Sequence, residues 1–280
     1  MPTSDEIKAT QRSVWGGVAG GWDKWYEELE RHSRPINEWL CQAAGLAPGM
    51  RVLDLASGSG QPAFTAAQLV RPGGSIVASD IAPEMVEVLR RRIAAAGSKD
   101  MEARVMDMEQ IDFPDASFDA VTCRWGFMFP PDPVRAMAEA LRVLKPGGRL
   151  STATWDAPEK NQWLGWAAFN AALGPPPPPD PNAPSPGRFS DPAVLEAMLR
   201  EAGFRSVSVE SRPFTYEFES ASAWWSLLTG IAPPAFSRMG QVSAADAPTV
   251  RETVLGEMEE LRAGGKLRLA AACLCVVAQK

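Results

Sequence analysis

Short apolar runs alternate with amphipathic segments through the middle of this chain. Five runs have the length and apolar character of buried strands, and they lie at residues 50–55, 75–79, 102–106, 118–123 and 149–154. Between them, three segments open with proline and have apolar residues at helical spacing, at residues 62–70, 83–96 and 133–144. Strands that alternate with helices in this way predict a doubly wound α/β sheet.

The segments that flank this core have other patterns. Residues 1–45 are expected to be helical, with several tryptophans among polar residues. Eight of the twelve residues at 175–186 are proline, which predicts an extended spacer because proline cannot join a sheet ladder or a helix interior. The C-terminal pattern predicts a helix, a half-exposed strand, a helical stretch with Phe236 and Met239, and a last strand, at residues 191–203, 204–210, 220–262 and 266–278.

These patterns divide the chain into four parts. With 280 residues, 45% of them hydrophobic, the chain can bury a sizeable core. We expect an N-terminal helical cap, a ligand-binding core, a proline-rich insertion and a C-terminal part of the core, at residues 1–45, 46–155, 156–190 and 191–280. Residues 220–262 in the C-terminal part are expected to form a helical substrate cap.

The charge balance and the rare residue types exclude several classes of function. The formal net charge of −6 disfavours binding to a phosphate backbone, so we expect no nucleic-acid partner. His32 is the single histidine, which rules out metal sites with two or more histidine ligands. Cys273 and Cys275 alternate on the last strand and are read as core residues. No metal is expected.

Location and membrane association are also constrained. The first ten residues, MPTSDEIKAT, include acids and have no apolar stretch, so no secretory signal is expected. The longest apolar run, residues 269–278, is too short to span a bilayer. Four cysteines without a disulfide spacing fit a reducing compartment. We therefore expect a cytoplasmic protein, and a monomer or homodimer.

A glycine-containing loop after the first strand is the first candidate ligand site. Residues Asp54 to Gly60 read DLASGSG, and Asp80 stands 20 residues after Gly60, at the end of the second strand. Glycines let the backbone approach a ligand, the next helix offers free N–H groups, and a carboxylate at the second strand can accept both hydroxyls of a ribose. Gly58, Gly60 and Ala63 match the G-x-G-x-x-G/A pattern, so a nicotinamide dinucleotide is one of two nucleotide cofactors that fit.

The third strand distinguishes between these two cofactors. It ends in Met106-Asp107-Met108, where an acid can accept from an adenine amine while the methionines cover the ring faces. Asp54 lies inside the first strand, where a dinucleotide fold normally has an apolar residue. The chain also ends with a strand after a long helical excursion. These features disfavour the dinucleotide.

Four motifs, taken in order, carry a resemblance to a known family. VLDLASGSG, SDIAPEM, VMDMEQIDFPDASFDAV and RVLKPGGRL resemble class I S-adenosylmethionine-dependent methyltransferases, most closely the ubiquinone/menaquinone-biosynthesis type and its small-molecule relatives. The resemblance covers residues 10–155, and more loosely residues 187–218 and 266–280. It implies a Rossmann-like seven-stranded sheet whose last strand is antiparallel and inserted near the edge, with helical caps, and a core at 46–155 that binds S-adenosylmethionine.

The resemblance also implies a set of cofactor contacts. They fall on Trp22, Asp54, Ala56, Ser57, Gly58, Gln61, Asp80, Ile81, Met106, Asp107, Met108, Cys123 and Arg124. Asp54 would help to hold the loop, Asp80 the ribose and Asp107 the adenine amine. Two positions depart from the family's commoner residues, because Ala56 stands where glycine is usual and Trp22 where tyrosine is frequent.

Methyl transfer from a sulfonium requires mainly that the protein orient the two reactants and exclude water. A base is needed only when the nucleophile carries a proton that must leave. His32 and Tyr26, near the aromatic N-terminal segment, are the candidate catalytic residues. For His32 the alternative is a solvated residue in the polar run ERHSR.

The aromatic residues indicate where an acceptor would bind. The chain has ten tryptophans and only two tyrosines. In open α/β sheets the ligand crevice lies at the carboxyl ends of the strands, and several aromatic residues follow the predicted strands or lie in the caps. The expected substrate pocket consists of Trp15, Trp125, Phe127, Phe129, Trp163, Trp166, Trp224 and Trp225. Core packing is the alternative for each of them taken singly.

The sequence thus favours a small-molecule methyltransferase that moves a methyl group from S-adenosylmethionine to an aromatic or apolar acceptor, at oxygen, carbon or nitrogen. S-adenosylhomocysteine would be the second product. A nicotinamide-dependent oxidoreductase and a non-methylating S-adenosylmethionine-binding protein are the two alternatives.

Overall fold

One mixed β-sheet organises the computed structural model, which describes residues 2–176, 180, 183–232, 238–239 and 242–280. The strand order is β3-β2-β1-β4-β5-β8-β6. Five strands pair in parallel: β1 (Arg51–Leu55), β2 (Ser75–Asp80), β3 (Met101–Val105), β4 (Phe118–Arg124) and β5 (Leu144–Trp155). This confirms the predicted Rossmann-like fold.

The last strand is antiparallel and lies inside the sheet, as expected. β8 (Lys266–Gln279) pairs with β5 on one side and with β6 (Ser206–Phe218) on the other. A two-residue strand, β7 (Arg262–Ala263), adds an eighth strand to the seven expected. β6 is also longer than the predicted segment 204–210, because it pairs with β8 over its whole length.

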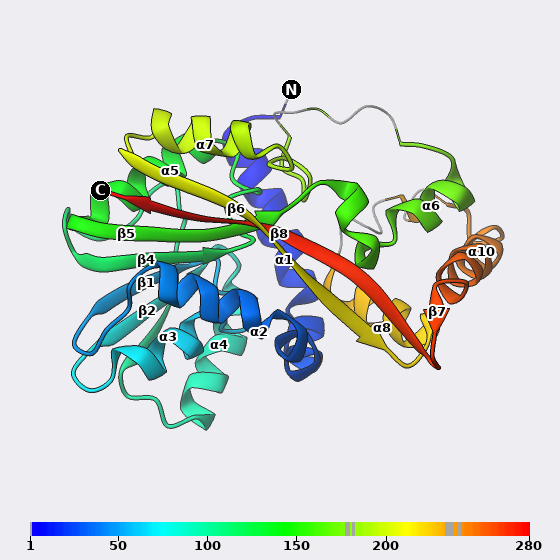
Figure 1. Ribbon diagram of the computed structural model, residues 1–280, viewed down its shortest axis with the longest axis horizontal. Coiled ribbons are helices and arrows are strands. Elements are labelled where there is room, and N and C mark those ends of the chain that lie inside the picture. Colours follow the sequence, from blue (N-terminus) through cyan, green and yellow to red (C-terminus); the bar gives the residue numbers. More distant parts are fainter. Residues whose placement is uncertain (1, 177–179, 181–182, 233–237, 240–241) are drawn as a thin grey trace.

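Helices cover both faces of the sheet (Figure 1). The elements α2 (Tyr26–Ala43), α3 (Ala63–Val70) and α4 (Pro83–Ala95) lie on one face, and α5 (Pro133–Val143) and α7 (Pro192–Glu201) lie on the other. α5 illustrates why the spacing of apolar residues predicted these helices, since its buried residues recur at helical spacing. The N-terminal α1 (Ser4–Lys24) runs across the carboxyl ends of the parallel strands (Figure 1).

A second group of helices lies around the long antiparallel pair of β6 and β8 (Figure 1). It contains the helices α6 (Trp166–Leu173), α8 (Ala221–Ile231) and α10 (Ala247–Glu259), and the short turns Pro158–Lys160 and Gln162–Leu164 precede it. The described part of the predicted helical stretch 220–262 contains α8 and α10, and Phe236 and several of the prolines lie outside the described residues. α6 was not expected, because WAAFNAAL is apolar on nearly every side and has no helical period.

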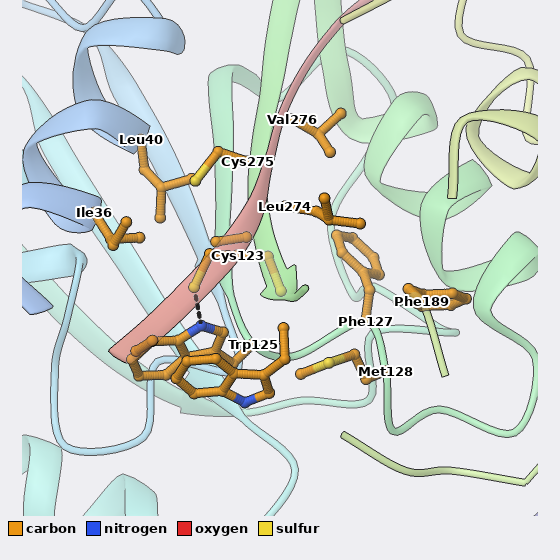
Figure 2. Close-up of a cluster of buried hydrophobic side chains, with 14 of the residues drawn as sticks. Ile36, Leu40, Cys123, Trp125, Phe127, Met128, Phe189, Leu274, Cys275 and Val276 are labelled. Atoms are coloured by element: carbon orange, nitrogen blue, oxygen red, sulfur yellow. Dashed lines mark hydrogen bonds between the residues drawn. The ribbon is translucent and has the colours of Figure 1, made fainter. Parts of the chain in front are cut away.

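The core lies between the sheet and its helices. Figure 2 shows Ile36 and Leu40 of α2 near Cys275, and Phe127 beside Leu274 and Phe189. Cys273 and Cys275 are fully buried, in agreement with their reading as core residues. In the described ranges, no helix is long and apolar enough to cross a bilayer.

Candidate cofactor and acceptor site

A large cavity opens at the carboxyl ends of the central strands. The space between its lining residues amounts to about 1310 Å³, open solvent at the mouth included. Its lining includes the loop after β1, the ends of β2 and β3, the turn after β4, and residues of α1 and α8. This is where an open α/β sheet places its ligands.

A buried carboxylate, that of Asp54, holds the glycine loop in place. Asp54 is fully buried and accepts hydrogen bonds from Ser57 Oγ (2.6 Å) and from Thr122 Oγ1 (2.6 Å). Burial raises the pKa of Asp54 to about 6, although both hydrogen bonds oppose the shift. Ala56 and Gly58 adopt left-handed backbone angles, with φ of 52° at both positions. Asp54 therefore holds the loop without lining the cavity itself.

Asp80 connects the loop to the cavity. Its Oδ2 accepts from the backbone N–H of Gly58 (3.0 Å), and its Oδ1 accepts from that of Ala82 (3.0 Å). The residue is 8% exposed and, with Ile81, lines the cavity. Burial is the main reason that its pKa rises to about 6.

The raised pKa predicts a pH dependence of cofactor binding. If Asp80 holds the ribose, its ionised carboxylate would accept two ribose hydroxyls, whereas the protonated acid would first have to lose its proton, so the affinity would be present above pH 6 and would decline below it. Between pH 7.5 and pH 5 we expect the affinity for S-adenosylhomocysteine, measured by calorimetry, to fall by about tenfold. Asp80→Asn should bind weakly at every pH and lack this dependence. Equal pH slopes for the two proteins would contradict this prediction.

Asp107, the predicted adenine contact, lines the cavity together with Met106 and Met108. An unexpected partner reaches it, since Lys8 of α1 lies 2.7 Å from Asp107 Oδ2 and 2.7 Å from Glu109 Oε2. Burial disfavours the charge on Lys8, but the hydrogen bonds that Lys8 donates to both carboxylates outweigh this effect and raise its pKa. The sequence pattern missed Lys8 and Glu109, because nothing in the chain order links residue 8 to the third strand.

The helix α1 forms the roof of the cavity. Lys8, Gln11, Trp15 and Trp22 all line it, at spacings that put them on one helix face. Trp15 packs edge-on against Phe129, with ring centroids 4.9 Å apart. The indole N–H of Trp22 donates to the backbone oxygen of Ile231 (3.0 Å) and so fastens α1 to the end of α8.

Four rings form the wall opposite the nucleotide-binding residues, and we call Trp125, Trp155, Trp163 and Tyr216 the aromatic wall. Trp125 stacks on Trp155 with centroids 4.4 Å apart, and Trp163 stacks on Tyr216 at 4.5 Å. All four line the cavity. Trp125 adopts a φ of 61°, a conformation that bulky residues rarely take and that clusters at functional sites. The sequence did not predict Trp155 and Tyr216 as pocket residues, because each lies at or beyond the end of a predicted strand.

Other predicted acceptor residues lie behind the cavity. Phe127 points into the buried cluster with Leu274 rather than toward Trp125 (Figure 2). Trp224 is fully buried and donates to the backbone oxygen of Trp163 (2.7 Å), so it supports the wall from outside. Trp166 and Trp225 also lie outside the lining, as does the predicted cofactor contact Cys123, which is buried at the end of β4.

The two candidate bases, His32 and Tyr26, make hydrogen-bond contacts with other residues of the protein. His32 does not line the cavity, and its ring nitrogens lie 3.2 Å from the Thr215 oxygen and 3.3 Å from a Glu28 oxygen. The hydroxyl of Tyr26 accepts a hydrogen bond from Gln61 Nε2 (2.9 Å), and Gln61 lines the cavity. Burial raises the pKa of Tyr26, so its phenol stays protonated. Tyr26 is placed to orient Gln61 rather than to remove a proton.

Known proteins share this architecture. The family described as "Methyltransferase domain" matches residues 53–152. Residues 53–152 are thus similar to a methyltransferase domain. Over 135 residues it is 37% identical to a demethylmenaquinone methyltransferase of Symbiobacterium thermophilum, covering 47% of this chain and 49% of that protein. The chain spans about half the length of the curated relatives it matches most strongly.

Solved structures agree on the fold of this methyltransferase domain. A SAM-dependent methyltransferase from Aquifex aeolicus aligns with a TM-score of 0.51 and 23% identity, over 66% of this chain and 89% of that one. The [4+2]-cyclase SpnF aligns with a TM-score of 0.56 and 19% identity, over 100% of this chain and 96% of that one. At these identities the likeness concerns the fold alone.

The residues present fit S-adenosylmethionine, the cofactor of this domain. A Cβ added at Gly58 would meet no atom within 4 Å, so the backbone faces open space in the cavity. Asp80 offers a buried carboxylate for the ribose, and Asp107 lies between two methionines that can cover an adenine. The loop residues Ala56 and Ser57 also line the cavity. The cavity thus has a polar nucleotide half and an aromatic half.

Proposed function

We propose that this protein is a methyltransferase that transfers a methyl group from S-adenosylmethionine to a small aromatic or apolar acceptor. The observation that carries the proposal is that one cavity is lined both by the carboxylates of Asp80 and Asp107 and by the aromatic wall. The relative that acts on demethylmenaquinone supports a planar, quinone-like acceptor.

The chain's own residues would act by binding and by exclusion of water. S-adenosylmethionine, when bound, supplies a methyl group already activated on a sulfonium. Asp80 and Asp107 would hold the nucleoside, while α1 and the aromatic wall enclose the space beside it. Alignment of the two reactants in a dry cavity accounts for roughly 7–11 kcal/mol of barrier reduction in favourable cases. Methyl transfer needs no more than this from the protein when the acceptor atom is already nucleophilic.

The acceptor would supply its own reactive electron pair. Within the described lining, the wall side offers aromatic and aliphatic groups and the guanidinium of Arg124, while Tyr26 and His32 stay outside it. A phenolate, an enolate or a neutral amine can attack without a protein base. The net charge of −6 favours such a small molecule over a nucleic acid as the partner.

Calorimetry and turnover test this function together. S-adenosylhomocysteine should bind and NAD should not, and a panel of phenols, quinols and amines with S-adenosylmethionine should yield methylated products by mass spectrometry. Binding of NAD alone would favour the oxidoreductase. Tight binding of S-adenosylhomocysteine without methylation across the panel would favour a non-methylating protein. Absence of S-adenosylhomocysteine binding at high micromolar ligand would overturn the proposal.

A further inference from the structure

A buried guanidinium stands where the two halves of the cavity meet. Arg124 ends β4 and lines the cavity, and its side chain is only 4% exposed. Glu30 of α2 holds it with an oxygen 2.9 Å from Nη2, and Asn37 accepts from Nη1 at 2.9 Å. The cationic carbon lies 4.4 Å from the ring centre of Trp125, and Trp125 also stacks on Trp155. Arg124 is thus fixed on several sides.

The hydrogen bonds of Arg124 leave donors unused. A guanidinium carries five N–H groups. To the described residues, Arg124 makes three hydrogen bonds, two from Nη1 and one from Nη2. The Nε–H and the second Nη2–H donate to no acceptor among the described residues, although the side chain is only 4% exposed. Donors in this state favour a ligand that brings a strong acceptor, because leaving them unpaired costs free energy.

The other cation of the lining is already paired. Lys8 lies at the adenine end and contacts the carboxylates of Asp107 and Glu109. Arg124 is also paired, with Glu30, but two of its N–H groups have no acceptor among the described residues. These two donors remain available to an anionic group of a ligand in the cavity.

Resting on the proposed function, we propose that the side chain of Arg124 binds an oxyanion inside the cavity. The oxyanion is either the carboxylate of the cofactor's amino-acid tail or the ionised oxygen of a phenolic or enolic acceptor. Glu30 and Asn37 are positioning residues, because they orient the guanidinium without lining the cavity. In either case Arg124 selects ligands by charge, which the aromatic wall cannot do.

Two probes distinguish the sources of the oxyanion. S-adenosylhomocysteine and 5′-methylthioadenosine share the nucleoside, but the second lacks the amino-acid tail, so calorimetry with both isolates the carboxylate. 4-Nitrophenol, added to protein saturated with 5′-methylthioadenosine, reports ionisation of an acceptor oxygen through its phenolate absorbance. Neither probe depends on turnover.

A double variant removes the guanidinium of Arg124 without leaving the charge of Glu30 unpaired. Arg124→Met alone would leave Glu30 as a buried unpaired charge and can unfold the protein. The double variant Arg124→Met/Glu30→Gln removes both charges, and circular dichroism checks its fold. Arg212→Met is the matched control, because Arg212 also lies over a tryptophan, 5.3 Å from the ring centre of Trp39, but outside the cavity lining.

We expect one of two results from the double variant. A loss of about tenfold or more in affinity for S-adenosylhomocysteine, with 5′-methylthioadenosine unchanged, assigns the cofactor carboxylate. Unchanged affinity for both, with 4-nitrophenol ionising at a pH about one unit higher than in wild type, assigns the acceptor oxygen. Less than a twofold change in all three measurements, in a folded protein, overturns the proposal.

The proposed function can fail separately. If wild-type protein binds neither nucleoside, the methyltransferase proposal falls, and the 4-nitrophenol titration without nucleoside then decides on Arg124. A phenolate signal that depends on Arg124 upholds the oxyanion site in that case, and its absence refutes it.

Discussion

Replacement of Asp80 by alanine is expected to weaken the binding of S-adenosylhomocysteine by about 100-fold or more. The ionised carboxylate can accept both ribose hydroxyls, and each charge-assisted hydrogen bond contributes roughly 1.5–3 kcal/mol, where about 1.4 kcal/mol corresponds to a factor of ten. Asp80 also accepts from the backbone of Gly58, so its loss loosens the loop as well. Isothermal titration calorimetry measures the effect.

The controls separate the ribose contact from a general loss of structure. Asp112→Ala removes an exposed carboxylate elsewhere and should leave the affinity unchanged. Asp80→Asn keeps the shape and one acceptor oxygen, and we expect an intermediate loss. If Asp80→Ala binds as tightly as wild type, Asp80 does not belong to the nucleotide site.

Alanine at Gly21 is expected to lower the free energy of unfolding by roughly 1–3 kcal/mol, the cost of overpacking. A Cβ at this position would overlap with the backbone oxygen of Gly230, where α1 crosses α8. Backbone atoms cannot move aside as a flexible side chain can, so the two helices must separate. The separation should also break the hydrogen bond from Trp22 to Ile231 and weaken cofactor binding, since Trp22 lines the cavity.

The neighbouring glycine supplies the matched control. Gly20 lies on the same helix with no atom within 4 Å of an added Cβ. Gly20→Ala should therefore stabilise the protein by roughly 0.5–1 kcal/mol, because alanine loses less backbone entropy in a helix. Denaturant unfolding of both variants measures the difference. Equal stabilities would show that α1 and α8 do not cross as closely as the structure has them.

The nucleotide half of the site was predictable because it depends on local order. Asp80 and Asp107 each follow directly from a strand, and the carboxyl ends of parallel strands meet at one edge of the sheet. The loop from Ala56 to Gly58 is likewise contiguous. Once the alternation of strands and helices was recognised, these residues had to converge.

The acceptor half was only partly predictable, because aromatic residues serve the core and the cavity alike. Trp125 and Phe127 are two residues apart, yet Trp125 lines the cavity and Phe127 lies in the buried cluster (Figure 2). Both are aromatic, so residue type does not distinguish them. The left-handed backbone turn at Trp125 directs the two side chains differently. The helical period likewise turns Trp224 inward, behind the wall.

The sequence by itself determined the order of strands and helices and the carboxylates at the strand ends, since each is encoded in short contiguous segments, whereas the antiparallel last strand was implied by the family resemblance. Only the tertiary structure decided which distant side chains pair: Lys8 with Asp107 and Glu109, and Glu30 with Arg124. These contacts depend on how α1 and α2 pack across the sheet. Such packing is the summed result of many weak apolar contacts, and no local pattern in the chain records it.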